Sequence, residues 1–296
     1  MRDTNALAPR KVSFVPDSSP QGPVGGALGR LPEPWRRQIE RLALDDAGHG
    51  FDPLGLSREG LAQGVWATRL LYERYFRVRS HGHANIPAEG PAILASNHSG
   101  MLPLDGMMLA LDVLRWSAPA RTLRPILDHF VPGLPFVSTF FARAGAIGGS
   151  RGNVRYALEH DQLLLIFPEG TEGIGKPFWK RYQLQEWRVG HVELAIRHRA
   201  PVVPVAVIGA EEQWPQIARL NGVHVLGIPF LPIPATPLPM PVRYHIYYGE
   251  PLDFRDRLRP EDADDPALVA AATAEVKEAV AALVARGLHE REGIFK

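Results

Sequence analysis

The sequence PAILASNHSGMLPLDG, residues 91–106, begins as a buried strand and turns polar within a few residues. The apolar run AILAS ends at Asn97 and His98, and Asp105 follows after a short glycine-containing turn. Polar groups at the end of a buried strand cost folding free energy unless they are paired or used. Pro103 suits the first position of a helix, where its missing N–H is not needed, so we expect Asp105 in the first helical turn.

The histidine and the aspartate have two interpretations. In the structural one, Asp105 favours the helix start through the helix dipole, and His98 satisfies a backbone group. In the functional one they form a dyad, in which the aspartate fixes the imidazole tautomer and stabilises imidazolium. The other ring nitrogen then takes a proton from an attacking hydroxyl or amine. The residues alone leave both interpretations open.

A second apolar run, LLLIFPEGTEGIGKPF at residues 163–178, also ends in a polar, glycine-containing turn. Open α/β sheets bind their ligands at the carboxyl ends of the strands. Glu169 in this turn either binds a substrate hydroxyl or braces a loop. We expect the two strand ends, at 97–98 and 168–170, to converge on one crevice.

The runs LLLIF and VVPVAVI are apolar without alternation, which indicates strands buried on both faces. We therefore predict an α/β fold with a mostly parallel central sheet flanked by helices, and an N-terminal helical region. The expected strands are 92–96, 124–128, 144–148, 163–168, 202–209 and 243–249. The expected helices are 32–46, 57–80, 104–116, 151–160, 185–199 and a final helix over 264–287 that stops at Gly287.

Composition divides the chain into three regions. Residues 1–30 are rich in proline, glycine and serine, and we expect a flexible arm. Residues 31–80 form the helical region, whose arginines either face solvent or lie at an anionic membrane surface. Residues 81–290 form the α/β domain.

The overall charge and residue content exclude several classes of function. The chain has 296 residues, is 45% hydrophobic and carries a formal net charge of +1, which argues against a nucleic-acid partner. It contains no cysteine, so disulfides, thiolate catalysis and cysteine-ligated zinc are excluded. Neither a signal peptide nor an apolar run long enough to span a bilayer is found, so we expect a cytoplasmic protein.

Two apolar segments are broken by prolines, at 129–141 and 222–241. Proline removes backbone donors, so we expect neither segment to form a good helix or strand. The second is a buried loop or a surface that touches lipid, and both remain open. Peripheral contact with the cytoplasmic face of a membrane follows from the lipid-touching alternative.

Four blocks, in order, resemble the glycerophospholipid acyltransferase superfamily, which includes the lysophosphatidate acyltransferases and has the PlsC-like fold. The resemblance spans roughly residues 78–255. The matching residues are Asn97, His98 and Asp105; Gly145, Ala146, Ile147 and Arg151; Phe167, Pro168, Glu169, Gly170 and Thr171; and Val203, Pro204 and Val205.

The resemblance implies an acyl transfer like that of a 1-acylglycerol-3-phosphate O-acyltransferase. The donor would be acyl-CoA or acyl carrier protein, the acceptor a hydroxyl of a lysophospholipid or other lipid-like molecule, and no cofactor or metal would be needed. His98 would be the general base and Asp105 its orienting partner, with Asn97 supporting the motif. The implied acceptor-binding residues are Arg151, Glu169, Gly170, Thr171 and Lys176, and Pro204 would shape the acyl-binding wall.

The chain departs from the family pattern at three places. Six residues separate His98 from Asp105, whereas the family has four. This variant resembles the branch with diacylglycerol-acyltransferase-like members. A bulge at Gly100 would keep the two side chains of the dyad in contact. Position 172 is Glu where the family commonly has an arginine, and an acid repels a phosphate; Lys176 could substitute. Gly149 and Ser150 also replace the usual residues before Arg151.

Two other functions remain open. Ser150 lies in the sequence GGSRG, which fits the nucleophile elbow of a serine esterase. Such an enzyme needs a later acid and then a histidine, and the candidate histidines are His191, His224, His245 and His289. The wider dyad spacing also suits a catalytically silent lipid-binding module. The sequence does not name the acceptor, the acyl length, the donor or the oligomeric state.

Overall fold

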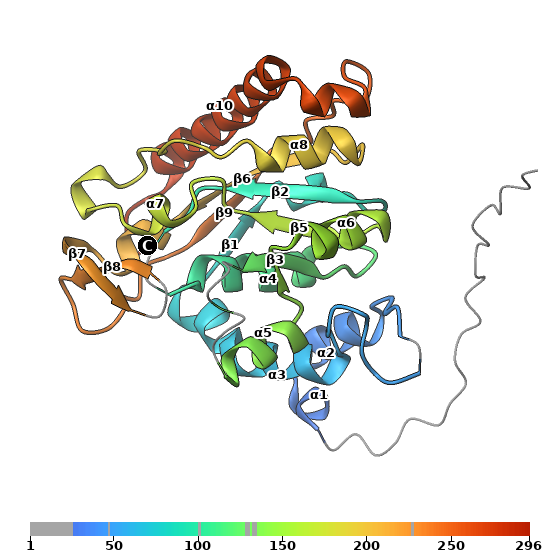
Figure 1. Ribbon diagram of the computed structural model, residues 1–296. Coiled ribbons are helices and arrows are strands. Elements are labelled where there is room, and N and C mark those ends of the chain that lie inside the picture. The colour runs from blue at the N-terminus through green and yellow to red at the C-terminus, as the bar shows by residue number, and fades with distance from the viewer. Residues whose placement is uncertain (1–25, 47, 100–101, 128–130, 132–134, 226–227) are drawn as a thin grey trace, which may run out of the picture.

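A seven-stranded sheet lies between two layers of helices in the computed structural model (Figure 1). The structure describes residues 26–296 except 47, 100–101, 128–130, 132–134 and 226–227, and every statement about the fold concerns that part of the chain. The strand order is β1-β9-β6-β2-β5-β3-β4, and all neighbours are parallel except β6 and β9. The predicted mostly parallel sheet is thus confirmed.

The strands of this sheet are short and mostly buried. Their bounds are β1 Arg79–His81, β2 Ala92–Ser96, β3 Leu123–Leu127, β4 Ile147–Gly148, β5 Leu163–Ile166, β6 Val202–Ile208 and β9 His245–Tyr248. A separate antiparallel pair consists of β7 Gln216–Val225 and β8 Ile228–Pro234.

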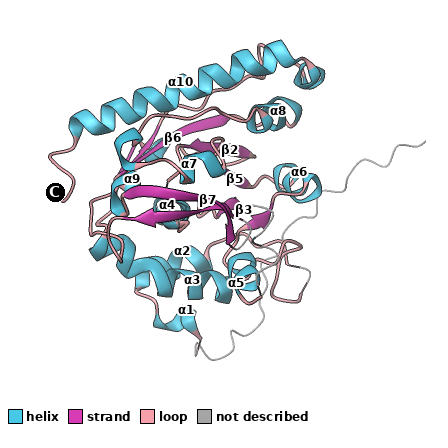
Figure 2. Ribbon diagram, turned by 60° about the vertical axis from the view of Figure 1, so that its left-hand side comes forward, coloured by secondary structure: helices cyan, strands magenta, loops and turns pink. Residues whose placement is uncertain are grey.

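The helices cover both faces of the sheet (Figure 2). Their bounds are α1 Ala27–Arg30, α2 Glu33–Glu40, α3 Arg58–Leu70, α4 Leu104–Trp116, α5 Val137–Arg143, α6 Arg151–Glu159, α7 Thr171–Ile174, α8 Gly190–Arg197, α9 Ala210–Gln213 and α10 Pro266–Glu290. No helix in the described part of the chain is both long and apolar enough to cross a membrane.

Alternate residues of each strand enter two different cores. Leu94 packs with α4 and the N-terminal helices, whereas its neighbour Ile93 packs with α6, α8 and α10. Successive side chains of a strand point to opposite faces, so a sheet covered on both sides is apolar at every position. This explains the unbroken apolar runs in the sequence. It also places the helices of residues 31–80 in the same core as the sheet.

The predicted helix over 57–80 is wrong at its C-terminal end. The α-helical part ends at Leu70, a π-helical turn follows over Leu71–Tyr75, and Arg77 takes a left-handed φ of 47°. Residues 79–81 instead form β1 beside β9. The periodicity of the helix could not reveal this strand, because a strand that pairs with a distant partner is stabilised by that partner.

The final helix passes through its predicted stop and continues to Glu290. Gly287 is buried, and a Cβ atom there would lie 2.6 Å from Cγ1 of Ile208 and 2.8 Å from the ring of Tyr247. The glycine therefore allows α10 to approach the sheet closely and does not end the helix.

Both proline-broken segments contain regular structure that the sequence analysis missed. Residues 137–141 of the first belong to α5, while 129–130 and 132–134 lie outside the described residues. The second segment provides most of the β7–β8 hairpin, with Pro232 and Pro234 in β8. Because β8 pairs with β7 alone, a proline nitrogen turned to the open edge costs no ladder hydrogen bond. Most of the predicted arm, residues 1–25, also lies outside the description.

We predict that acid weakens the fold through His191 on α8. Burial lowers the pKa of His191 from 6.5 to about 4, so below about pH 6.5 the unfolded chain binds a proton that the folded chain does not. The free energy of unfolding should fall by on the order of 3 kcal/mol from this group as the pH drops from about 6.5 to 4. The pKa of His245 is also lowered to about 4, so this residue adds to the loss of stability in acid.

Urea unfolding of His191→Leu across this pH range measures its share. In this variant, the free energy of unfolding should depend less steeply on pH, by up to the contribution of one proton. His289→Gln, a change at an exposed site, should leave that pH dependence unchanged. An unchanged slope in His191→Leu would contradict the assignment.

Candidate active site

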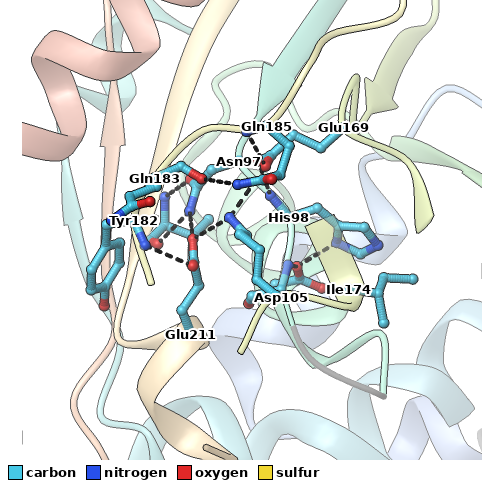
Figure 3. Close-up of polar contacts among 12 residues, drawn as sticks. Asn97, His98, Asp105, Glu169, Ile174, Tyr182, Gln183, Gln185 and Glu211 are labelled. Atoms are coloured by element: carbon cyan, nitrogen blue, oxygen red, sulfur yellow. Dashed lines mark hydrogen bonds and ion pairs between the residues drawn. The ribbon is translucent and has the colours of Figure 1, made fainter. Parts of the chain in front are cut away.

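The polar ends of β2 and β5 lie side by side, because these strands are parallel neighbours with Ala95 opposite Ile166. Figure 3 shows the resulting cluster around His98. The two strand ends therefore converge as the sequence predicts, at the carboxyl edge of the sheet.

His98 and Asp105 are in direct contact. Nδ1 of His98 lies 2.7 Å from Oδ2 of Asp105, and the same oxygen accepts the Ser99 backbone N–H at 2.9 Å. A carboxylate only accepts, so the hydrogen of the imidazole is assigned to Nδ1 and Nε2 is the basic nitrogen. The six-residue spacing keeps the pair together; the bulge expected at Gly100 falls outside the described residues.

The imidazole is also held on its face. The Phe167 ring stacks on that of His98, with centroids 4.0 Å apart and planes 16° apart. Asp105 is fully buried, while the His98 side chain remains 11% exposed. The ring is therefore fixed in orientation yet keeps some access to its surroundings.

Glu169, from the turn after β5, binds backbone amides from two other segments. Its Oε1 accepts the His98 N–H at 3.2 Å, and its Oε2 accepts the Gln185 N–H at 2.9 Å. Lys176 Nζ lies 3.2 Å from Oε2. In this conformation Glu169 braces the loop, the second of the two roles that the sequence left open.

Lys176 is buried between two carboxylates and does not reach out to solvent. Its Nζ also lies 3.0 Å from Oε1 of Glu211, which in turn receives the Asn97 Nδ2 at 3.4 Å. The Asn97 amide forms two further hydrogen bonds with the backbone of Val207, which tie the end of β2 to β6. Burial raises the pKa of Glu211, and the Lys176 ammonium opposes that rise.

A cavity of about 400 Å³ opens beside Lys176. It lies between the segment after α7 and strand β7, and Glu172 faces Arg219 across it at 3.9 Å. A smaller hollow shares Lys176 with this cavity and extends to Ser99, next to His98. The described lining residues of the larger cavity are Glu172, Gly175, Lys176, Pro177, Trp179, Lys180, Gln185, Gln216, Ala218 and Arg219.

Other predicted site residues are not joined to this network. Arg151 is exposed at the start of α6 and forms no ion pair within the described residues. Pro204 lies in β6 opposite Ala95, buried in the sheet. Gly170 adopts a positive φ of 55°, and Thr171 begins α7, where its side chain is outside the description. Their substrate-binding roles stay predictions.

Ser150 has the geometry of a helix cap. Its hydroxyl oxygen accepts the Asn153 N–H at 3.2 Å, and its backbone is extended, with φ −69° and ψ 146°. Among the candidate partners with described side chains, His191 bonds to the Arg188 carbonyl and His245 pairs with His81. None contacts Ser150, so the geometry does not support the nucleophile elbow.

The sequence analysis missed Glu211, Tyr182 and Gly173. Glu211 follows β6 in the sequence VAVIGAEE, the same signal of acids after a buried strand that marks the ends of β2 and β5. Gly173 packs so closely that a Cβ there would lie 3.1 Å from the Cβ of His98. No group of three histidine, aspartate or glutamate side chains suited to a metal occurs among the described residues.

A family model described as Acyltransferase matches residues 77–208. The fold is also similar to the crystal structure of the 1-acyl-sn-glycerophosphate acyltransferase PlsC from Thermotoga maritima, with a TM-score of 0.52, 19% identity and 80% of each chain covered. The expected fold is confirmed, and the match of residues 77–208 to the Acyltransferase family agrees with the resemblance found in the sequence.

Similar proteins include an uncharacterized protein of Mycobacterium tuberculosis, 35% identical over 237 residues, which cover 77% of this chain and 66% of that protein. The DGAT1/2-independent enzyme synthesizing storage lipids from Bos taurus is 28% identical over 222 residues, 71% of this chain and 59% of the enzyme. The chain thus spans less than two thirds of the length of these relatives.

Proposed function

We propose that the protein moves a fatty acyl group from a thioester, acyl-CoA or acyl carrier protein, to a hydroxyl of a lipid-like acceptor. The observation that carries the proposal is the contact between His98 and Asp105 at 2.7 Å. Nε2 of His98 takes the acceptor proton as the oxygen attacks the thioester carbonyl. A C–O bond forms, the C–S bond breaks, and the leaving thiolate takes the proton from the imidazolium, which Asp105 stabilises meanwhile.

The superfamily supports acyl transfer, and two relatives support a lipid acceptor. The Thermotoga protein is named for 1-acyl-sn-glycerophosphate and the bovine one for storage lipids. The capped hydroxyl of Ser150 favours direct transfer over an acyl-enzyme. A silent lipid-binding module would have no use for an oriented imidazole.

Replacing His98 tests the reaction. General-base catalysis contributes about 10²–10⁴-fold, so His98→Ala should lose acyl transfer by that factor while the variant still folds. Release of free CoA, with mass spectrometry of the acylated product, measures the effect. Ser150→Ala is the control and should retain its rate; the opposite pattern would establish the esterase, and a wild type that consumes no thioester would establish the binding module.

We propose further that the preferred acceptor carries no phosphate. Glu172 lines the cavity and offsets the charge of Arg219, 3.9 Å away, at the position where the family that the sequence resembles commonly has an arginine. Lys176 cannot readily replace that arginine, because two buried carboxylates already balance its charge. The name of the bovine relative agrees with a neutral acceptor.

Glu172→Arg should shift acceptor choice toward phosphate. A cation in place of an anion at the cavity favours a phosphorylated acceptor, so kcat/KM for lysophosphatidate relative to monoacylglycerol should rise by about tenfold. Glu186→Arg adds the same charge on the same segment outside the cavity and should leave the ratio unchanged. A wild type that already prefers lysophosphatidate, or a Glu172→Arg variant with an unchanged ratio, would contradict the acceptor proposal.

Contact with an anionic bilayer beside the cavity is a further part of this proposal. Ile217 and Leu220 of β7 are 53% and 49% exposed, Trp179 is 64% exposed, and Lys180 lies next to it. Sedimentation with phosphatidylcholine vesicles containing phosphatidylglycerol measures binding. A variant with both Ile217→Ser and Leu220→Ser should bind at least about tenfold more weakly. A loss caused instead by Trp66→Ser would assign the contact to α3.

A further inference from the structure

Two carboxylates and one ammonium join three separate segments next to His98. Glu169 follows β5, Lys176 follows α7, and Glu211 lies in α9. Their side chains are 0%, 4% and 4% exposed, so water screens none of these charges. Lys176 Nζ lies 3.2 Å from Glu169 and 3.0 Å from Glu211, and it is the bridge between them.

Each carboxylate also binds backbone N–H groups of the segment that covers the site. Glu169 accepts from Gln185, and Glu211 accepts from Tyr182 at 2.7 Å. A second lysine, Lys277 of α10, donates to the Gln185 carbonyl at 2.7 Å. The segment over 182–185 is thus bound by both glutamates and by Lys277 of α10.

This arrangement reaches His98 through Glu169, whose Oε1 accepts the His98 N–H. Only an ionised carboxylate can accept fully at both oxygens, since a protonated one turns an oxygen into a donor. Two buried carboxylates that face each other without a cation cannot both remain ionised. Without Lys176, then, the two carboxylates would repel each other, and the contact of Glu169 with the His98 backbone N–H would weaken.

We propose that Lys176 and Glu211 are positioning residues for the proposed acyl transfer, acting on His98 through the ionised carboxylate of Glu169. This inference rests on the proposed function. Neither residue touches the reacting atoms in this account, and neither belongs to the sequence blocks that mark the superfamily.

Lys176→Met, which keeps the length of the side chain and removes its charge, tests the proposal. We expect kcat at pH 7 to fall by about tenfold or more, with the donor KM within about threefold. Adding Glu211→Gln to this variant removes the opposed carboxylate, and the double variant should regain much of the lost kcat. Lys176→Arg keeps the charge and should keep most of the rate.

Lys277→Met is the matched control, because it removes a lysine of α10 that binds the same segment at Gln185 but leaves the two glutamates bridged by Lys176. Its kcat should stay within about twofold of wild type. Equal losses in Lys176→Met and Lys277→Met, or no recovery in the double variant, would overturn the proposal. If Lys176→Met does not fold, the double variant Lys176→Met with Glu211→Gln serves as the test. A folded double variant that is as inactive as His98→Ala would also overturn the proposal.

The same assay distinguishes a failure of this inference from a failure of the proposed acyl transfer. A wild type that transfers no acyl group, or a fully active His98→Ala, refutes the acyltransferase proposal itself. Results for Lys176 bear on the inference only when wild type is active and His98→Ala is not.

Discussion

The contact between Nδ1 of His98 and the Asp105 carboxylate is the constraint on which the rest of the site depends. Asp105 is fully buried, and a buried carboxylate needs donors to offset the loss of its hydration. It receives them from the imidazole, from the Ser99 backbone and from the Gly106 backbone. Removing the histidine leaves that carboxylate with backbone donors alone, so the pair contributes to the fold as well as to the proposed chemistry.

The sheet brings the remaining groups to this contact. β2 and β5 run parallel as neighbours, so the residues after each strand share one edge, and Phe167 and Glu169 reach His98 from the adjacent strand end. Asn97 secures the other side by pairing with Val207 of β6. His98 is therefore held at its ring edge by α4 and at its ring face and backbone by the segment after β5, while β6 holds the neighbouring Asn97.

Local sequence predicted the central strands and the helix that carries Asp105. β2 over 92–96 and α4 over 104–116 have the predicted bounds, because burial on both faces and a proline at a helix start leave clear local patterns. β1 and the β7–β8 hairpin were missed, since each is stabilised by pairing between segments that the local pattern does not connect. The prolines of β8 also made that strand hard to predict, because a strand with one open edge accepts prolines that a central strand would not.

Within the site, the sequence predicted His98, Asp105 and Glu169, which lie at or near the ends of apolar runs. It did not reveal that Lys176 faces two carboxylates, because Glu211 comes from a segment 35 residues away in the chain. A lysine in a glycine-rich loop is an anion ligand or a buried brace depending on its partners in space. Sequence spacing does not determine that choice.

The central claim is that Asp105 makes His98 a competent base, and Asp105→Asn tests it most directly. The amide keeps the shape of the side chain, but it replaces one accepting oxygen with a donating NH₂ and removes the charge that stabilises imidazolium. With saturating acyl-CoA and acceptor, the account predicts that kcat for CoA release falls by about 100-fold or more in a variant that still folds. An Asp105→Asn variant that turns over within threefold of wild type would contradict it.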